Sequence, residues 1–280
     1  MIRVARSRQP QQLDGFTGAA LQAKLQKLMA YWYEDAGKVD FKPKARQLWP
    51  RAKAQLKVES SGKCAYCEAD TAVVAYGDVE HFRPKSAYWW LAYSYDNYTF
   101  SCQVCNQVYK SDNFGLAGRK LPAPPLPAAL SGEAVERARL AATLCPDPAT
   151  SDDETLARAL AGERADLPHP YLEDPELLFA WQVIPETQEV WLIARGDSVR
   201  ARRAVKAAET VLGLNRTELL RLRWNDYDEL ETLALALQEG RFGDVEKLKL
   251  LNRLRRYAGS DRPFAGMRRF FMRGWGLLDT

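Results

Sequence analysis

Four of the five cysteines in this chain form two Cys-x-x-Cys pairs, Cys64 with Cys67 and Cys102 with Cys105. Each pair offers two thiolates about one turn apart, and two such pairs supply the four sulfur ligands of a tetrahedral zinc site. A single pair is a weak indication of a metal, whereas two pairs that enclose further candidate ligands are a strong one. The sequence therefore predicts a structural Zn²⁺ held by these four side chains.

The segment between and just after the cysteine pairs carries a second group of reactive side chains: Glu80, His81, Asn97 and Asn106. A neutral imidazole has an ordinary pKa of about 6.5 and can take a proton from water. The Glu80 carboxylate and the Asn106 amide oxygen are hard ligands that suit Mg²⁺. Neighbours in a strand point to opposite sides, so a bend or bulge near Pro84 is expected to bring Glu80 and His81 to one site. Asn97 is expected to hydrogen-bond a turn or to orient the imidazole.

This arrangement resembles the HNH (ββα-metal) nuclease family. That family combines an acidic-His pair on a first strand, a central Asn in a loop and a final His or Asn on a helix, often braced by two Cys-x-x-Cys pairs. The resemblance implies hydrolysis of DNA phosphodiester bonds with Mg²⁺ or Mn²⁺. It implies that His81 is the general base, that Glu80 and Asn106 bind the catalytic metal, and that Asn97 supports His81. Glu80 departs from the commoner Asp, and Asn106 stands where many members have His.

Two motifs are more specific than the general HNH pattern: Val-Glu-His-Phe-Arg-Pro-Lys, and after it Ser-Cys-Gln-Val-Cys-Asn. They are similar to those of the nuclease component of Septu and related retron-associated anti-phage systems. That similarity implies a bacterial defence role beside an ABC- or SMC-type ATPase partner. Two alternatives stay open: cleavage of RNA such as tRNA, and a non-catalytic zinc module that binds nucleic acid or an ATPase.

Basic side chains near the histidine are candidates for contacts with substrate phosphates. Arg83 and Lys85 are equally compatible with a solvated surface, and Lys110 follows Asn106 at helical spacing. His169 and Cys145 are expected to be structural. The most basic stretch of the chain is a second candidate surface for a DNA backbone, although exposed helix faces also carry arginine routinely. It comprises Arg253, Arg255, Arg256, Arg268, Arg269 and Arg273.

The composition of the 280 residues predicts a folded core, since 46% are apolar and 27% are charged. The net charge of +4 permits nucleic-acid binding but does not argue for it. Neither a signal peptide nor an apolar run long enough for a membrane span is recognisable. A soluble, cytoplasmic protein with reduced cysteines is therefore expected.

The elements that position these residues are predicted to form an α+β fold, predominantly helical, with a small zinc-braced ββα unit between helical segments. We divide the chain into an N-terminal helical segment (1–60), the cysteine-bearing unit (61–120) and a proline-rich linker with a hairpin and C-terminal helices (121–280). Pro50 is expected to kink or split one helix, Asn215 with Glu218 to cap another, and Gly240 to end it. Periodicity predicts helices at 17–35, 43–58, 131–144, 198–212, 215–238 and 244–257, one short helix in 147–166, and strands at 179–184 and 189–194.

Overall fold

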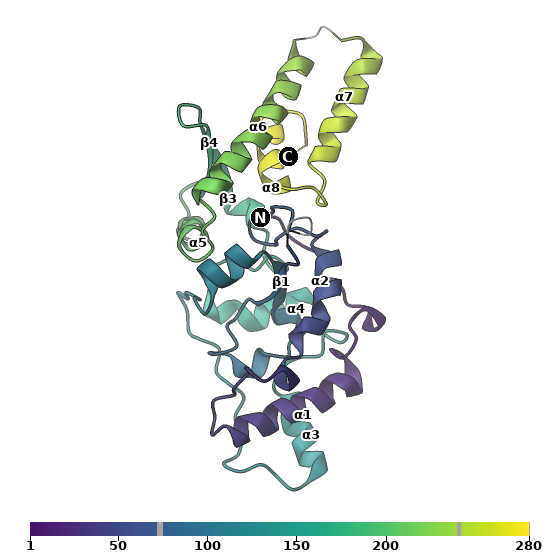
Figure 1. Ribbon diagram of the computed structural model, residues 1–280, viewed down its shortest axis with the longest axis vertical. Helices are drawn as coiled ribbons and strands as arrows, with labels where there is room; N and C mark the ends of the chain where they lie inside the picture. Colours follow the sequence, from purple (N-terminus) through teal and green to yellow (C-terminus); the bar gives the residue numbers. More distant parts are fainter. Residues whose placement is uncertain (72–74, 240–241, 280) are drawn as a thin grey trace.

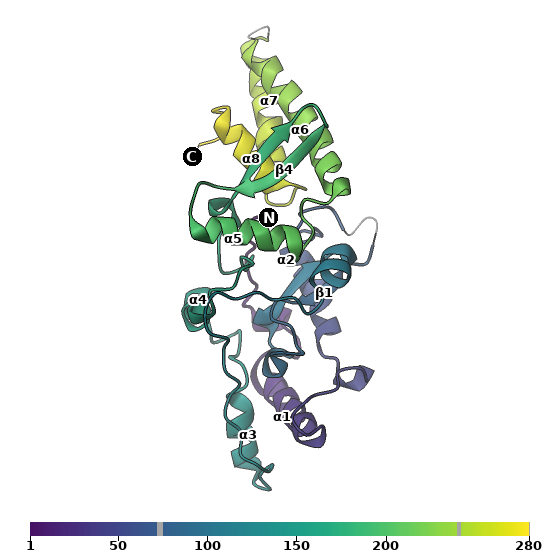
Figure 2. The same cartoon turned by 90° about the vertical axis from the view of Figure 1, so that its left-hand side faces the viewer.

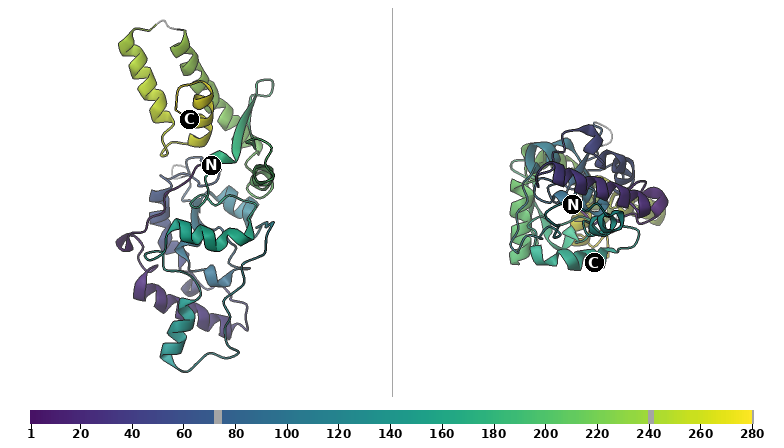
Figure 3. Two further views of the ribbon diagram at one scale, coloured as in Figure 1. Left: turned by 180° about the vertical axis from the view of Figure 1, so that it is seen from behind. Right: turned by 90° about the horizontal axis from the view of Figure 1, so that it is seen from below.

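A computed structural model describes residues 1–71, 75–239 and 242–279 of the chain. The molecule is elongated, with α1 (Gly18–Glu34) and α3 (Ala134–Ala142) side by side at one end (Figure 1). The hairpin of α6 (Thr217–Gln238) and α7 (Asp244–Tyr257) forms the opposite end, as the view from behind also shows (Figure 3). Helices dominate, and the described residues contain two two-stranded sheets. The predicted mixed and mainly helical class is therefore confirmed.

The N-terminal segment forms helices close to the predicted bounds. Thr17 occupies the N-cap position of α1, although its side chain makes no cap hydrogen bond. The apolar face of α1 buries Leu21, Leu25, Leu28 and Met29. The predicted second helix is split, as expected around Pro50. Its parts are 3₁₀ turns at Lys44–Arg46 and Trp49–Ala52 and a short α2 (Lys53–Glu59).

Two short strands carry the chemistry-bearing segment. β1 (Asp78–His81) pairs antiparallel with β2 (Tyr98–Ser101), with Glu80 opposite Thr99 and His81 opposite Tyr98. A π-helical segment, η6 (Val104–Lys110), follows β2 directly. The strands and the helical segment follow one another in the predicted ββα order. π-Helical turns are rare and are frequently found at functional sites.

The middle of the chain forms α4 (Asp153–Leu160), capped by the Asp152 side chain, and an antiparallel hairpin of β3 (Phe179–Ile184) and β4 (Glu189–Ala194). Helix α5 (Val199–Thr210) follows and is capped by Ser198. In the side view, α5 lies between the hairpin and the layer that contains β1 (Figure 2). The hairpin strands were predicted with their observed bounds, and α5 within two residues of its bounds.

Three helices complete the chain: α6 (Thr217–Gln238), α7 (Asp244–Tyr257) and α8 (Ala265–Gly274). The capping prediction for Asn215 is wrong. Its side chain instead accepts from the Leu192 backbone N–H at 2.9 Å and donates to the Leu192 carbonyl at 3.0 Å, so it ties the helix start to β4. Helix α8 was not predicted, and Gly240 lies outside the described residues.

The cysteine-bearing unit lies between two large apolar cores. One core joins Cys64, Phe82 and Cys105 to the β3–β4 hairpin and to α5. The other joins Tyr98 and Phe100 of β2 to α1 and α3. Burial on both sides fixes β1 and η6 in place. Throughout the described parts of the chain, no helix is both long enough and apolar enough to cross a membrane.

Candidate functional site

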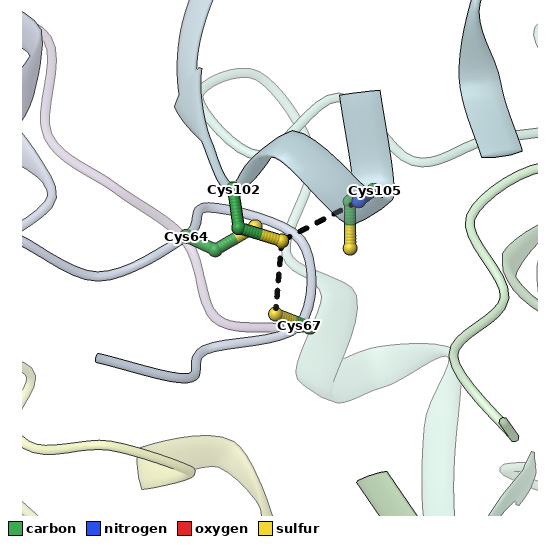
Figure 4. Close-up of side chains that lie close together, drawn as sticks. All are labelled: Cys64, Cys67, Cys102 and Cys105. Carbon is green, nitrogen blue, oxygen red and sulfur yellow. Dashed lines mark hydrogen bonds between the residues drawn. The ribbon is translucent and has the colours of Figure 1, made fainter. Parts of the chain in front are cut away.

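The four predicted zinc ligands meet at one point. The Sγ atoms of Cys64, Cys67, Cys102 and Cys105 all lie within 4.8 Å of one another, and the four sulfurs point toward a common centre (Figure 4). A tetrahedral Zn²⁺ with Zn–S bonds of about 2.3 Å separates its sulfurs by about 3.8 Å, and the distance from Cys67 Sγ to Cys102 Sγ is 3.9 Å. The cluster can therefore hold a metal ion such as zinc.

Two arginines of the α6 region lie beside this cluster. Arg216 donates through Nη1 to Cys105 Sγ at 3.7 Å. Arg223 is buried with its guanidinium over the Trp181 ring, 4.7 Å from the centroid. Burial lowers the pKa of Arg223 to about 10, and Cys67 is the strongest influence in the opposite direction. The guanidinium therefore stays charged at neutral pH.

A polar cleft of about 470 Å³ opens where β1 ends. Glu80, His81 and Asn106 all line it, so three of the four predicted catalytic residues share one cavity. The pairing of β1 is regular through His81, so no bulge brings them together. Instead, His81 is the last residue of the strand, where side chains of both faces reach the cleft. The remaining lining residues are Trp49, Pro50, Lys53, Asp78, Val79, Pro84, Lys85, Gln107, Ser111 and Asp112.

His81 is held between two aromatic rings, with one of its ring nitrogens bound to a backbone carbonyl. Its ring lies edge-on to Trp49 and Tyr98, with centroids 4.9 and 5.0 Å away. Nε2 lies 3.2 Å from the carbonyl oxygen of Ala92, which assigns the proton to Nε2 and leaves Nδ1 free to accept one. Burial, with a smaller contribution from Lys85, lowers the pKa of His81 to about 3. The imidazole is therefore neutral at physiological pH.

The Glu80 side chain contacts Lys110, the last residue of η6. Burial raises the pKa of its carboxyl to about 7, against the opposing effect of Lys110. Lys110 Nζ lies 2.5 Å from Glu80 Oε1 and donates to the carbonyl oxygen of His81 at 3.0 Å. Lys110 is fully buried and does not line the cleft. Its predicted contact with substrate is therefore corrected to a positioning role between η6 and β1.

The orientation of Asn106 is set by an acid that sequence reasoning missed. Asn106 Nδ2 donates to Asp78 Oδ2 at 3.2 Å, and Gln107 Nε2 donates to the same oxygen at 2.9 Å. Asp78 lies two residues before Glu80 and so on the same face of the strand. Because the amide nitrogen is engaged, the amide oxygen of Asn106 is left for the cleft. The i, i+2 spacing of Asp78 and Glu80 in a strand is the sequence feature that could have indicated this second acid.

Asn97 and Arg83 lie behind the cleft. Asn97 accepts from the Arg83 backbone N–H and donates to the Arg83 carbonyl, both at 2.9 Å, so it braces the loop after His81 without contacting the imidazole. Asn97 was predicted either to hydrogen-bond a turn or to orient the imidazole, and these hydrogen bonds support the first role. The Arg83 side chain is buried and pairs with Glu163 at 2.7 Å. The suggested phosphate contact of Arg83 is not supported by this position.

Lys85 does line the cleft, half-buried, with Nζ 5.3 Å from the centroid of the Trp49 ring. Trp49 and Lys53 come from the N-terminal segment, and no spacing in the sequence links them to the cysteine unit. His169 packs on Phe82 at 4.3 Å, away from this cleft, and Cys145 is buried. Their placement agrees with the structural roles expected of them.

One segment of the chain is similar to a known protein. Over 72 residues it is 42% identical to the Septu protein PtuB of Bacillus mycoides (strain KBAB4). The similarity covers 21% of this chain and 24% of that protein, so the chain spans about a quarter of the relative's length. No protein-family model matches the chain. The similarity supports a relation to the Septu system, while the HNH assignment stays a prediction.

Proposed function

We propose that the protein is a metal-dependent HNH endonuclease that hydrolyses DNA and acts as the nuclease of a bacterial anti-phage system. The observation that carries the proposal is the shared cleft of Glu80, His81 and Asn106 beside a four-cysteine centre. The similarity to Septu protein PtuB supports the defence role. A Septu-type system implies a second component, and we propose an ABC- or SMC-type ATPase as the partner.

The proposed mechanism begins with water in the cleft. His81 takes a proton from that water at Nδ1, because Nε2 is held by the Ala92 carbonyl. The resulting hydroxide attacks the phosphorus atom, and the bond to the leaving oxygen breaks. The low pKa of His81 is matched to this role only when an anionic phosphate lies nearby, since a negative charge stabilises the imidazolium.

The side chains of the cleft fit a hard divalent cation. Glu80 and Asn106 would hold it, with Asp78 fixing the amide of Asn106. Among the described residues the cysteines form the only group of three or more acidic, His or Cys ligands, so few protein ligands are offered here. Mg²⁺ typically binds through one or two carboxylates and keeps several waters, which suits such a site. When bound, Mg²⁺ or Mn²⁺ would neutralise charge on the phosphate and the leaving oxygen.

The test is cleavage of plasmid DNA and of tRNA by the wild-type protein and by His81→Ala, with Mg²⁺ or Mn²⁺ added. We expect cleavage of DNA and a loss of about 10²- to 10⁴-fold in rate in the variant, the usual effect of removing a general base. The matched control is His169→Gln, which alters the other histidine of the chain and should retain activity.

Three outcomes separate the alternatives. Preferential cleavage of tRNA would assign RNA as the substrate. Equal cleavage by the wild type and His81→Ala would exclude the assigned base. No cleavage by either, with defence activity lost in Cys102→Ala and kept in His81→Ala, would favour a non-catalytic zinc module.

A further inference from the structure

Helix α6 buries a positive charge that hydrogen bonds compensate only in part. Arg223 is 1% exposed, and its Nε and Nη1 atoms have no hydrogen-bond partner among the residues that the structure describes. Stacking on Trp181 offsets only part of the loss of hydration. An unpaired buried charge is strongly destabilising, so a counter-charge must lie close by.

A second arginine of the same region points at the cysteine centre directly. Arg216 precedes α6, and its Nη1 lies 3.7 Å from Cys105 Sγ and 3.1 Å from the carbonyl oxygen of Gly213. Arg216 and Arg223 are seven residues apart, which is two turns and therefore the same side of the helix. The carboxylate whose charge acts on Arg223 is Glu68, and it is itself paired with the N-terminal ammonium and with Lys63.

The charges of the centre match those of the two arginines. Four thiolates and one Zn²⁺ carry a net charge of −2, and two guanidinium groups carry +2. Four protonated thiols would carry no charge to offset that of the two arginines. We propose that Arg216 and Arg223 are the counter-ions of the metal–thiolate centre, which thereby anchors α6 and the C-terminal helices to the cysteine-bearing unit.

The proposal does not depend on any cleavage reaction. It has two linked consequences, one for metal binding and one for the docking of α6. Because coupling between sites is reciprocal, the arginines must strengthen metal binding as much as the metal strengthens the docking of α6. Other contacts of the first cysteine pair run to the same region. Lys63 Nζ donates to the Arg262 carbonyl at 2.7 Å, and the Gly266 N–H donates to Glu68 at 3.3 Å. Loss of the metal should therefore loosen α8 as well as α6.

The first measurement is the zinc affinity of the full chain, read by competition with a chromogenic chelator. We expect Arg216→Met and Arg223→Met to bind zinc about 10- to 100-fold more weakly than the wild type, as is typical when an outer partner of a metal site is removed. Arg221→Met is the matched control, because Arg221 is exposed on the same helix.

Arg223→Lys keeps the charge and should retain most of the affinity. If Arg223→Met does not fold, Arg216→Met carries the test, since Arg216 is only partly buried. Affinities equal to that of the control would overturn the proposal.

The second measurement is hydrogen exchange of the full chain with zinc and after chelation. In the wild type, amides of α6 and α8 should exchange roughly tenfold faster or more once zinc is removed, while those of α1 should change little. In the Arg216→Met protein the same removal should have a smaller effect on α6. Unchanged exchange in α6, or an equal rise in α1 and α6, would contradict a specific anchor.

Discussion

The two histidines of the chain are both buried and neutral, yet their surroundings give them different uses. His81 reaches a polar cleft and keeps one ring nitrogen free, whereas His169 is enclosed by Phe82 and Tyr171. His169 Nδ1 accepts from the Tyr171 backbone N–H at 3.3 Å. Burial, followed by the charges of Arg83 and Arg6, holds the pKa of His169 well below its usual value. A base with this environment makes folding sensitive to acid.

We predict that His169→Gln removes part of that acid sensitivity. The unfolded chain takes up a proton at His169 below about pH 6.5 while the folded chain does not. The stabilising contribution is therefore present above pH 6.5 and is lost as the pH falls. Relative to the variant, the wild type should lose about 1.4 kcal/mol of unfolding free energy per pH unit below about pH 6. Urea titrations of both proteins at pH 7, 6 and 5 measure this, and parallel pH dependences would contradict it.

At the scale of elements, the sequence predicted what local rules determine and missed what distant partners stabilise. The periodic apolar faces of α1 and α6, and the hairpin spacing of β3 and β4, are local properties. Helix α8 follows Phe264, which has a positive φ of 51°, and contains Gly266, so local rules argue against it. It is held by ion pairs that Arg268 makes with Asp226, and that Arg269 and Arg273 make with Glu176. No local sequence pattern predicts ion pairs between residues so far apart in the chain.

The same division holds within the candidate site. The cysteine spacing predicted the sulfur cluster because Cys-x-x-Cys pairs are local motifs. The roles of Glu80, His81 and Asn106 were predicted from their positions in the HNH-like motif. Trp49 and Lys53 reach the cleft only because the 3₁₀ turn Trp49–Ala52 and helix α2 contact β1. Lys110 forms an ion pair with Glu80 because η6 packs on the strand. Which basic residues face solvent is decided by tertiary packing, so the sequence could not show that Arg83 and Lys110 are buried while Lys85 lines the cleft.

Gly213 is an element boundary at which this packing can be tested. It ends the α5 region with φ of +59°, and an added Cβ would lie 2.4 Å from Cζ of the Tyr109 ring in η6. We predict that Gly213→Ala lowers the unfolding free energy by about 1–3 kcal/mol, from left-handed strain and overpacking.

The control for this substitution is Gly132→Ala. The position that an added Cβ would occupy at Gly132 meets no other part of the described chain within 4 Å, and the φ of this glycine is not positive. That variant should shift stability by less than about 1 kcal/mol. Equal urea midpoints for the two variants would refute the prediction.

At the scale of the whole molecule, the distribution of unpaired positive charge bears on where nucleic acid binds. Three of the six C-terminal arginines are engaged in the ion pairs that hold α8. Arg255 and Arg256, in the last turn of α7, remain exposed. Lys53 and Lys85 line the cleft itself. Because they stand beside the proposed base, they are better placed than α7 to hold phosphates next to the reacting one.

We therefore predict that the cleft lysines, and not the α7 arginines, govern the salt dependence of nucleic-acid binding. Each phosphate contact contributes about 0.9 to the slope of log K against log salt concentration on duplex DNA, so Lys53→Ala with Lys85→Ala should reduce that slope by about 1.8. Arg255→Ala with Arg256→Ala removes the same charge from the exposed helix and should leave the slope unchanged. Fluorescence anisotropy of a labelled duplex in buffer without Mg²⁺ or Mn²⁺ separates binding from cleavage and leaves the zinc in place. A reduced slope in the α7 pair alone would move the nucleic-acid surface to the C-terminal hairpin.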